Sequence, residues 1–296
     1  MHFPFLSEDK KQRYVAHLAE RAKAWPVPCE ERTVETSRGR TFMRISGPAD
    51  APPLVLLPGG ATSSLMWRPV IAGLASRYRV YALDSILDVG LSANSGPVKT
   101  VDDLVEWLDE LFRALGFGPD LRLMGMSHGG WLAANFALRR PERVGKVVLV
   151  APAAFVLDMK LSIVFQMISI LFPPRRFWIR RTYRASLPGL ARTAAGPAII
   201  DDMTEDLALA FECFGVRRLT QMVPPLKASD EELRGLRVPT LYVVGEDETI
   251  YDPKAALARL EQVAPQVQRA LVPGAGHDLP WSKPAELGAL ALEFLG

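Results

Sequence analysis

Residues 121–139 join a short apolar run to an Ala- and Leu-rich segment through a serine between glycines, and this stretch restricts the possible folds most. The apolar run, which ends at Met124, predicts a buried strand. Residues 131–139 contain no Gly or Pro and have helical composition. A turn this sharp, at Gly125-Met126-Ser127-His128-Gly129, forces its central residue into a strained conformation and needs small residues two positions to either side. It predicts a serine hydroxyl at the end of a sheet with a helix N-terminus behind it; the alternative is a glycine-rich turn that only connects the two elements.

Most of the chain repeats this order of short apolar strands and helices. Strands are expected at 54–57, 79–83, 146–150, 241–244 and 267–272, and helices at 65–75, 100–115, 253–263 and 284–294. An N-terminal helix at 7–25 and a hairpin at 27–46 precede them. Alternation of this kind predicts the α/β class, with a mostly parallel central sheet covered by helices on both faces.

Ligands of such sheets bind beyond the carboxyl ends of the strands. Four groups follow predicted strands directly: Pro58-Gly59-Gly60, Ser127, residues 245–248 and residues 273–277. We therefore expect them to share one edge of the sheet and to form a site.

Residues 151–237 interrupt this order, because they show no strand-like alternation and are divided by Pro173-Pro174, Pro188, Pro197 and Pro224-Pro225. We interpret residues 153–237 as a helical lid inserted into a core made of 1–152 and 238–296. Its first helix is expected at 155–172, where the polar stripe of Asp158, Ser162, Gln166 and Ser169 is too narrow for a surface helix. The other faces should therefore be covered, by packing on the core and by forming a roof over an apolar substrate pocket.

Five arginines follow that helix, at positions 175, 176, 180, 181 and 184. We interpret them as a solvated face, with contact to anionic lipid as the alternative. Eighteen residues that contain Asp, Lys and Gln are a poor membrane span, so no stable membrane insertion is expected.

Composition excludes several classes of protein. A net charge of +2 gives no reason to expect a nucleic-acid partner. Cys29 and Cys213 are too few for a disulfide framework and are expected to be free thiols in a reducing compartment. No Cys/His cluster has metal-ligand spacing, and the N-terminus becomes charged before a signal-peptide core could form. The protein is therefore expected to be cytoplasmic and to bind no metal, while its oligomeric state stays open.

A serine hydroxyl is a poor nucleophile at neutral pH and needs a base within hydrogen-bond reach. Two of the four histidines, His2 and His17, lie in the N-terminal extension, and His128 adjoins Ser127 on a turn that points neighbouring side chains apart. Elimination leaves His277, in a glycine-rich loop after the last predicted strand, as the base; the alternative is an ordinary surface-loop histidine.

The acid that orients this base should lie between Ser127 and His277 in the sequence. Gly245-Glu246-Asp247-Glu248 offers three carboxylates directly after a predicted strand. Asp252, just before Pro253, is better explained as a helix N-cap.

These motifs, over nearly the whole chain, resemble an α/β-hydrolase fold serine hydrolase. Gly125 to Gly130 matches the nucleophile turn of that family, Gly276-His277-Asp278 its histidine loop, and Arg140-Pro141-Glu142-Arg143-Val144 a run typical before its sixth strand. Leu57-Pro58-Gly59-Gly60 takes the place of its His-Gly oxyanion loop, with Pro58 where His is usual. The resemblance implies an oxyanion hole made by the backbone N–H groups of Gly60 and His128.

The resemblance also implies that Glu248 is the acid, because the family's acid stands three positions after the glycine that ends this strand. Asp247 is the alternative, since Asp is the commoner residue in this role. Residues 84–92 and 245–253 look more like a carboxylesterase-like branch than like the common form of the family.

We therefore expect a serine hydrolase that cleaves carboxylic esters with an apolar acyl or alcohol part and needs no metal or organic cofactor. A carbon–carbon bond hydrolase or a thioesterase could use the same triad. A ligand-binding protein that kept the fold without catalysis is the alternative from another class, but no triad member is missing. Haloalkane dehalogenation is disfavoured, because it uses a carboxylate nucleophile and Ser127 is not one.

Overall fold

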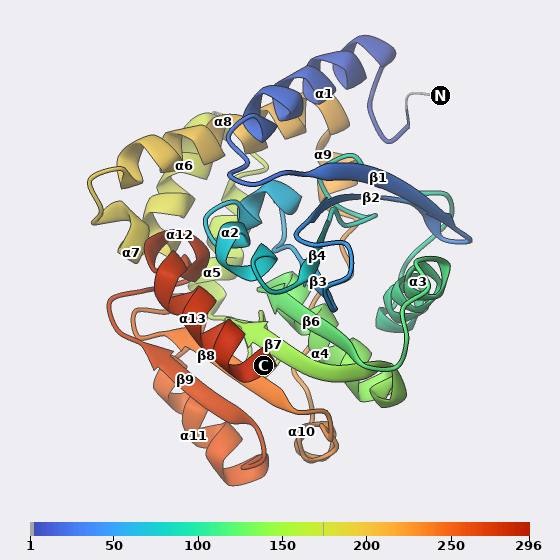
Figure 1. The fold of residues 1–296 in the computed structure, drawn as a ribbon. Helices are drawn as coiled ribbons and strands as arrows, with labels where there is room; N and C mark the ends of the chain where they lie inside the picture. Colours follow the sequence, from blue (N-terminus) through green and yellow to red (C-terminus); the bar gives the residue numbers. More distant parts are fainter. Residues whose placement is uncertain (1–2, 174) are drawn as a thin grey trace.

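The computed structural model describes residues 3–173 and 175–296 (Figure 1). His2, one of the four histidines, and Pro174, one of the prolines expected to divide the insertion, lie outside these described residues.

A single sheet forms the centre of the molecule (Figure 1). Its strands, in the described chain, are β1 (Glu30–Thr36), β2 (Gly39–Ser46), β3 (Pro53–Leu57), β4 (Arg79–Leu83), β5 (Ala93–Asn94), β6 (Leu121–Met126), β7 (Val144–Val150), β8 (Thr240–Gly245) and β9 (Gln268–Val272). They lie in the order β1-β2-β4-β3-β6-β7-β8-β9, with β5 paired to β2. β2 is antiparallel to β1, β4 and β5, and the remaining pairs are parallel. The predicted hairpin and the predicted mostly parallel sheet are both confirmed.

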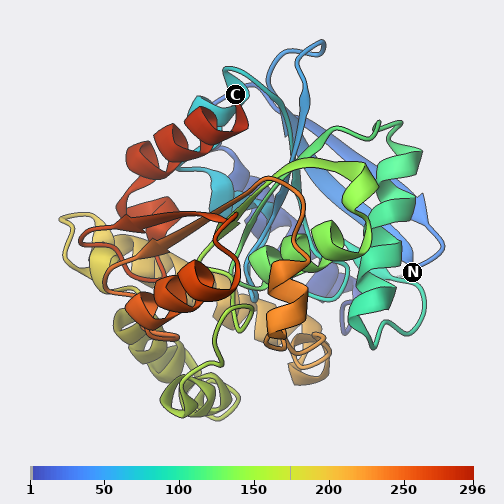
Figure 2. The ribbon, with the colours of Figure 1, turned by 90° about the horizontal axis from the view of Figure 1, so that it is seen from below.

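Helices cover the sheet on both faces (Figure 2). They are α2 (Ile71–Ala75), α3 (Val101–Ala114), α4 (His128–Arg139), α11 (Pro253–Val263), α12 (Leu279–Ser282) and α13 (Pro284–Leu295). Helix α1 (Glu8–Ala22) packs instead on the helical insertion. Successive residues of β3 alternate between two cores: Val55 and Leu57 pack with α3, α4 and α11, whereas Leu54 and Leu56 pack with α2 and α13. Because both faces are buried, the inner strands are continuous apolar runs, which is why they were recognisable in the sequence.

Local signals fix most helix ends. The Ser7 hydroxyl accepts from the Lys10 N–H at the start of α1, and the Asp252 carboxylate accepts from the Ala255 N–H at the start of α11, as predicted. The helix expected at 65–75 is instead a 3₁₀ turn (Ser64–Trp67) followed by α2. Pro69 lies between the two pieces and has no N–H to continue a helix.

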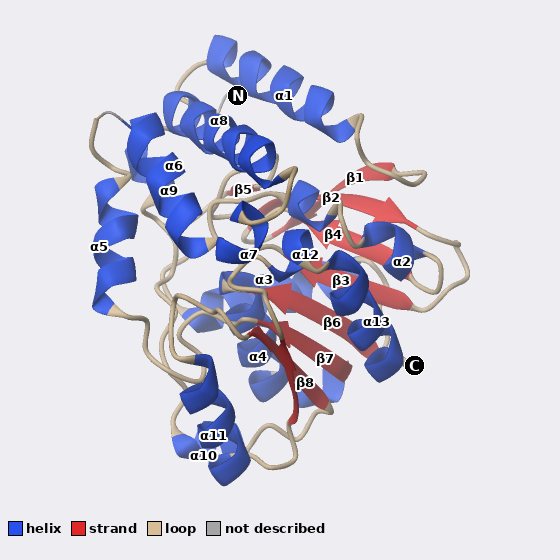
Figure 3. Cartoon of the chain, turned by 90° about the vertical axis from the view of Figure 1, so that its left-hand side faces the viewer, coloured by secondary structure: helices blue, strands red, loops and turns tan. Residues whose placement is uncertain are grey.

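Helices are the regular structure of the segment between β7 and β8 in its described part, as expected, with non-helical stretches at 151–160 and 221–229 (Figure 3). It contains α5 (Leu161–Ser169), α6 (Arg175–Ser186), α7 (Pro188–Ala191), α8 (Gly196–Phe214), α9 (Val216–Leu219) and α10 (Asp230–Arg234). α8 lies between α1 and α6 (Figure 3). Arg176 and Arg180 of α6 form surface ion pairs with Glu205 and Asp201 of α8. Four of the five arginines, at 176, 180, 181 and 184, are exposed, so the interpretation as a solvated face is confirmed.

The first helix of the insertion is shorter than predicted, and this expectation was wrong. Residues 155–160 are not helical because their backbone bonds elsewhere: the Phe155 carbonyl accepts from Ala228 N–H and the Lys160 N–H donates to the Ile250 carbonyl. The helix therefore begins only at Leu161.

The expectation that the apolar faces of this helix are covered was also wrong. Leu161, Phe165, Ile168 and Phe172, spaced by four, three and four residues, all lie exposed, with Phe165 at 68%. Only Ile163 of α5 is buried, so α5 rests on the protein by one edge. No other described element lies over the outward stripe.

Candidate active site

Ser127 occupies the turn between β6 and α4 in a conformation that few residues adopt. Its φ is 52° and its ψ is −117°, and it is the N-cap residue of α4. A Cβ on Gly129 would lie 2.3 Å from the Leu57 carbonyl oxygen, and one on Gly125 would lie 2.2 Å from the Gly129 oxygen. The strained centre and the need for small flanking residues are thus confirmed. Ser127 itself is partly exposed.

His277 and Glu248 meet at the same edge of the sheet, in the loops that follow β9 and β8. The His277 Nδ1 atom lies 2.9 Å from Glu248 Oε2, and both side chains are buried. A carboxylate only accepts, so Nδ1 carries the hydrogen and Nε2 of the neutral ring keeps its lone pair. The other Glu248 oxygen accepts from the Ile250 N–H at 2.8 Å, which fixes the carboxylate in place.

The two other carboxylates of this loop face elsewhere. Asp247 Oδ2 lies 2.5 Å from Arg192 Nη2 in the helical insertion, and Glu246 is exposed. Of the three carboxylates that the residues alone left open, only Glu248 contacts His277. The family spacing, three positions after Gly245, favoured Glu248, whereas residue type alone favoured Asp247.

The glycine loop after β3 lies beside the Ser127 turn. A Cβ on Gly59 would be 3.6 Å from Ser127 Cβ, and a Cβ on Gly60 would be 3.9 Å from His128 Cβ. The His128 ring points away from the turn, and its Nε2–H donates to the Val223 carbonyl at 2.9 Å. Burial lowers the pKa of His128, so this ring is neutral and is engaged by the insertion. Because the first N–H groups of an α-helix have no intrahelical partner, those at the N-terminus of α4 are expected to be available beside Ser127, its N-cap residue.

Sequence reasoning missed the buried polar residues that support the glycine loop. Asp88 Oδ2 accepts from the N–H of Ala61, the residue after Gly60, at 2.7 Å. Asp84 Oδ1 accepts from the Ser64 N–H at 2.7 Å. Arg218 of α9 reaches the Asp88 loop from the insertion. The departure of residues 84–92 from the common family pattern was the available signal for the two aspartates, and Arg218 had none.

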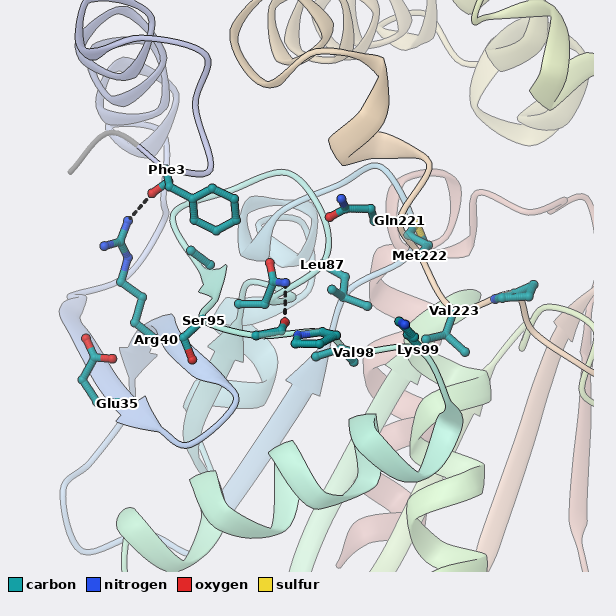
Figure 4. Close-up of a pocket in the computed structure, with 15 residues that line it drawn as sticks. Phe3, Glu35, Arg40, Leu87, Ser95, Val98, Lys99, Gln221, Met222 and Val223 are labelled. Atoms are coloured by element: carbon teal, nitrogen blue, oxygen red, sulfur yellow. Dashed lines mark hydrogen bonds between the residues drawn. The ribbon is translucent and has the colours of Figure 1, made fainter.

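A cavity of about 860 Å³ lies next to this edge, between the N-terminal segment, residues 93–99 and residues 221–224 (Figure 4). Leu87, Val98 and Val223 give it apolar walls. Among the described residues that line it, neither Ser127 nor His277 occurs. Met222 separates the cavity from the glycine loop, because a Cβ on Gly60 would lie 3.0 Å from Met222 Cε.

No group of three His, Cys, Asp or Glu side chains among the described residues could hold a metal ion. Likewise, none of the helices in the described ranges is long and apolar enough to cross a membrane.

Comparison with known proteins places this chain in a family. Residues 54–290 match the model of the alpha/beta hydrolase family. Carboxylesterase nap of Bacillus subtilis is 32% identical over 97% of this chain and 93% of its own length. Carboxylesterase YbfK of the same organism is 32% identical over 98% of this chain and 96% of its own. The crystal structure of the B. subtilis naproxen esterase, carboxylesterase NP, aligns at a TM-score of 0.88 and 31% identity, over 98% of this chain and 99% of that one. The chain belongs to the alpha/beta hydrolase family and is a carboxylesterase-like member of it.

Proposed function

We propose that this protein is a carboxylic ester hydrolase that works through an acyl-enzyme, with Ser127 as nucleophile, His277 as base and Glu248 as the residue that orients the base. The observation that carries the proposal is the buried His277–Glu248 hydrogen bond of 2.9 Å, which leaves Nε2 free to accept a proton at the sheet edge where Ser127 stands. The kinship with carboxylesterases over nearly the whole chain supports the reaction type.

In the first half-reaction, Ser127 Oγ attacks the ester carbonyl carbon while its proton passes to His277 Nε2. The N–H groups of Gly60 and His128 donate to the oxyanion of the tetrahedral intermediate. As the intermediate collapses, the proton passes from His277 to the leaving alcohol. Water then repeats the sequence on the acyl-enzyme and releases the acid.

The Ser127 hydroxyl makes no hydrogen bond with any described residue. Catalytic hydrogen bonds are often long without substrate, so the Ser127–His277 contact is expected to close as the ester binds. Glu248, which stabilises the imidazolium, is preferred over Asp247 because Arg192 already engages Asp247.

The division into a core of 1–152 and 238–296 and a lid of 153–237 belongs to the same proposal. The Lys160–Ile250 backbone bond ties the start of α5 to the loop of Glu248, and the buried Ile163 packs in the core that includes Ile250 and Val223. These contacts support a lid whose inner edge borders an apolar ester site. Both cysteines are unpaired, which supports a reducing, cytoplasmic location.

Replacing the nucleophile tests the proposal. Ser127→Ala should lower kcat for a short p-nitrophenyl ester by about 10⁶-fold, as expected for a residue that acts within a triad. Its thermal unfolding should match that of the wild type. Unchanged turnover in this variant would refute the proposal.

A further inference from the structure

A segment in the last part of the helical insertion, before α10, contacts both predicted oxyanion donors. We call residues 216–226 the strap. Within it, the Val223 carbonyl accepts from the His128 ring, the Leu226 carbonyl accepts from Trp131 Nε1 at 3.0 Å, and Met222 packs against Gly60. The strap is therefore attached to α4 on one side and to the glycine loop on the other.

The glycine loop has a second support, beneath it. Ala61 has a φ of 58°, a conformation that costs a non-glycine residue free energy and persists only when neighbours hold it. Asp88 Oδ2 holds it by accepting from the Ala61 N–H, while Oδ1 accepts from the Val89 N–H and fixes the carboxylate, each at 2.7 Å. Because Ala61 directly follows Gly60, this bond fixes the peptide plane next to the proposed donor.

Arg218 links these two supports. Its guanidinium donates to Asn94 Oδ1 at 2.5 Å, to the Asp88 carbonyl at 3.4 Å and to the Ile86 carbonyl. It is buried, although it belongs to the insertion. Its positive charge favours the ionised form of the buried Asp88 carboxylate, which accepts two N–H bonds.

We propose that Asp88 is a positioning residue of the oxyanion hole and that Arg218 couples it to the insertion. An ionised Asp88 holds the Ala61 peptide so that the Gly60 N–H points at the developing oxyanion, and Arg218 keeps that carboxylate charged and locks the strap over the hole. The inference rests on the proposed ester-hydrolase function and assigns no chemical step to either residue.

Electrostatics agree with this arrangement. Burial raises the pKa of Asp88 to about 6, against the opposing effects of the two backbone N–H groups and Arg218. Burial also lowers the pKa of Arg218 to about 10, so it stays charged at pH 7. The other titratable groups that face Asp88 are Asp84 after β4, Tyr14 of α1 and Tyr183 of α6. Asp84 raises the pKa of Asp88 further, whereas Arg218 opposes its protonation.

Asp88→Asn tests the positioning role, because an amide has one acceptor oxygen and cannot satisfy both N–H groups. We expect kcat to fall about tenfold to a hundredfold, less than the 10²–10³ that follows loss of a whole oxyanion donor. KM should change by less than about twofold, because the interaction forms only in the transition state. Affinity for a phenylboronic acid, which forms a tetrahedral serine adduct, should fall by the same factor as kcat/KM, while affinity for the matching carboxamide should not.

Asp102→Asn, an exposed carboxylate of α3, is the matched control and should behave as the wild type. A purely structural role for Asp88 would lower the melting temperature but leave kcat and the boronate-to-carboxamide affinity ratio of the folded fraction unchanged. That result would overturn the inference.

Arg218→Met and Arg218→Lys test the coupling. Without the charge, Asp88 should protonate at higher pH, so the acid limb of the kcat profile should move to higher pH in Arg218→Met. Arg218→Lys keeps a positive charge and should therefore retain much of the wild-type pH profile of kcat. Identical profiles for the two variants would overturn the inference even if Asp88→Asn does not fold. Wild-type protein that hydrolyses no ester would refute the proposed function, whereas an active wild type and an equally active Asp88→Asn variant would refute the positioning role alone.

Discussion

The carboxyl edge of the sheet and helix α5 depart from the usual burial pattern in opposite ways, because the edge buries charged side chains and α5 exposes apolar ones. At the edge, charged groups such as Glu248 and Asp88 are buried, and each carboxylate accepts from fixed donors. On α5, the apolar stripe that includes Leu161 and Phe165 is exposed, and only Ile163 is buried. Burying a charge is costly unless it is paired and hydrogen-bonded, so the buried carboxylates of the edge should tolerate few substitutions. The exposed apolar side chains of α5 have no buried partners to lose, so their substitution should change stability little.

The largest expected effect separates two adjacent carboxylates at the edge. Glu248→Gln should lower kcat by about 10⁴-fold, because an amide can orient His277 in the wrong tautomer and cannot stabilise its positive charge. Asp247→Asn, which removes only a partly exposed ion pair with Arg192, should change kcat by less than about threefold. Steady-state kinetics on one p-nitrophenyl ester measures both. The reverse ranking would move the acid to Asp247.

A second pair of variants compares the two sides of α5. Ile163→Ala removes a buried side chain and should lower the free energy of unfolding by about 2–5 kcal/mol. Phe165→Ala, on the outward stripe, should change it by no more than about 0.5 kcal/mol. Urea unfolding gives both values. A large loss in Phe165→Ala would show that the stripe is covered in solution, and the contrast with the edge would then fail.

The smallest effect is expected where the strap meets the cavity. Met222→Ala should open the 860 Å³ cavity toward Gly60, so that esters with a longer acyl or alcohol chain gain about 1–3 kcal/mol relative to short ones. The measurement is the ratio of kcat/KM for long and short p-nitrophenyl esters. Leu226→Ala, at an exposed strap residue outside the cavity lining, is the control. An unchanged ratio in Met222→Ala would mean that the cavity does not serve the substrate.

Elements with a strong local signal were predictable. The inner strands are buried on both faces and appear as continuous apolar runs, and α11 has both its predicted ends because Asp252 caps it and Pro253 fits its first position. The Ser127 turn was equally readable, since glycines at 125 and 129 are needed for the close approach of strand and helix.

Features set by long-range contacts were not predictable in the same way. Residues 155–160 have helical composition, but their backbone groups bond to Ala228 and Ile250, more than seventy positions away in the sequence. The burial of Arg218 depends on the carbonyls of Ile86 and Asp88, which lie far away in the sequence. No local sequence pattern predicts such partners. The prediction of Glu248 as the acid also depended on the spacing found in the family, because the residues alone offered three candidate carboxylates.

The central claim is that Ser127 carries the acyl group. The most direct measurement is peptide mapping by mass spectrometry after reaction with a fluorophosphonate probe, on the wild type and on Ser127→Ala. The account predicts a single modified peptide that contains Ser127 in the wild type, and no modification of the variant. Modification at another residue, or equal modification of Ser127→Ala, would contradict it.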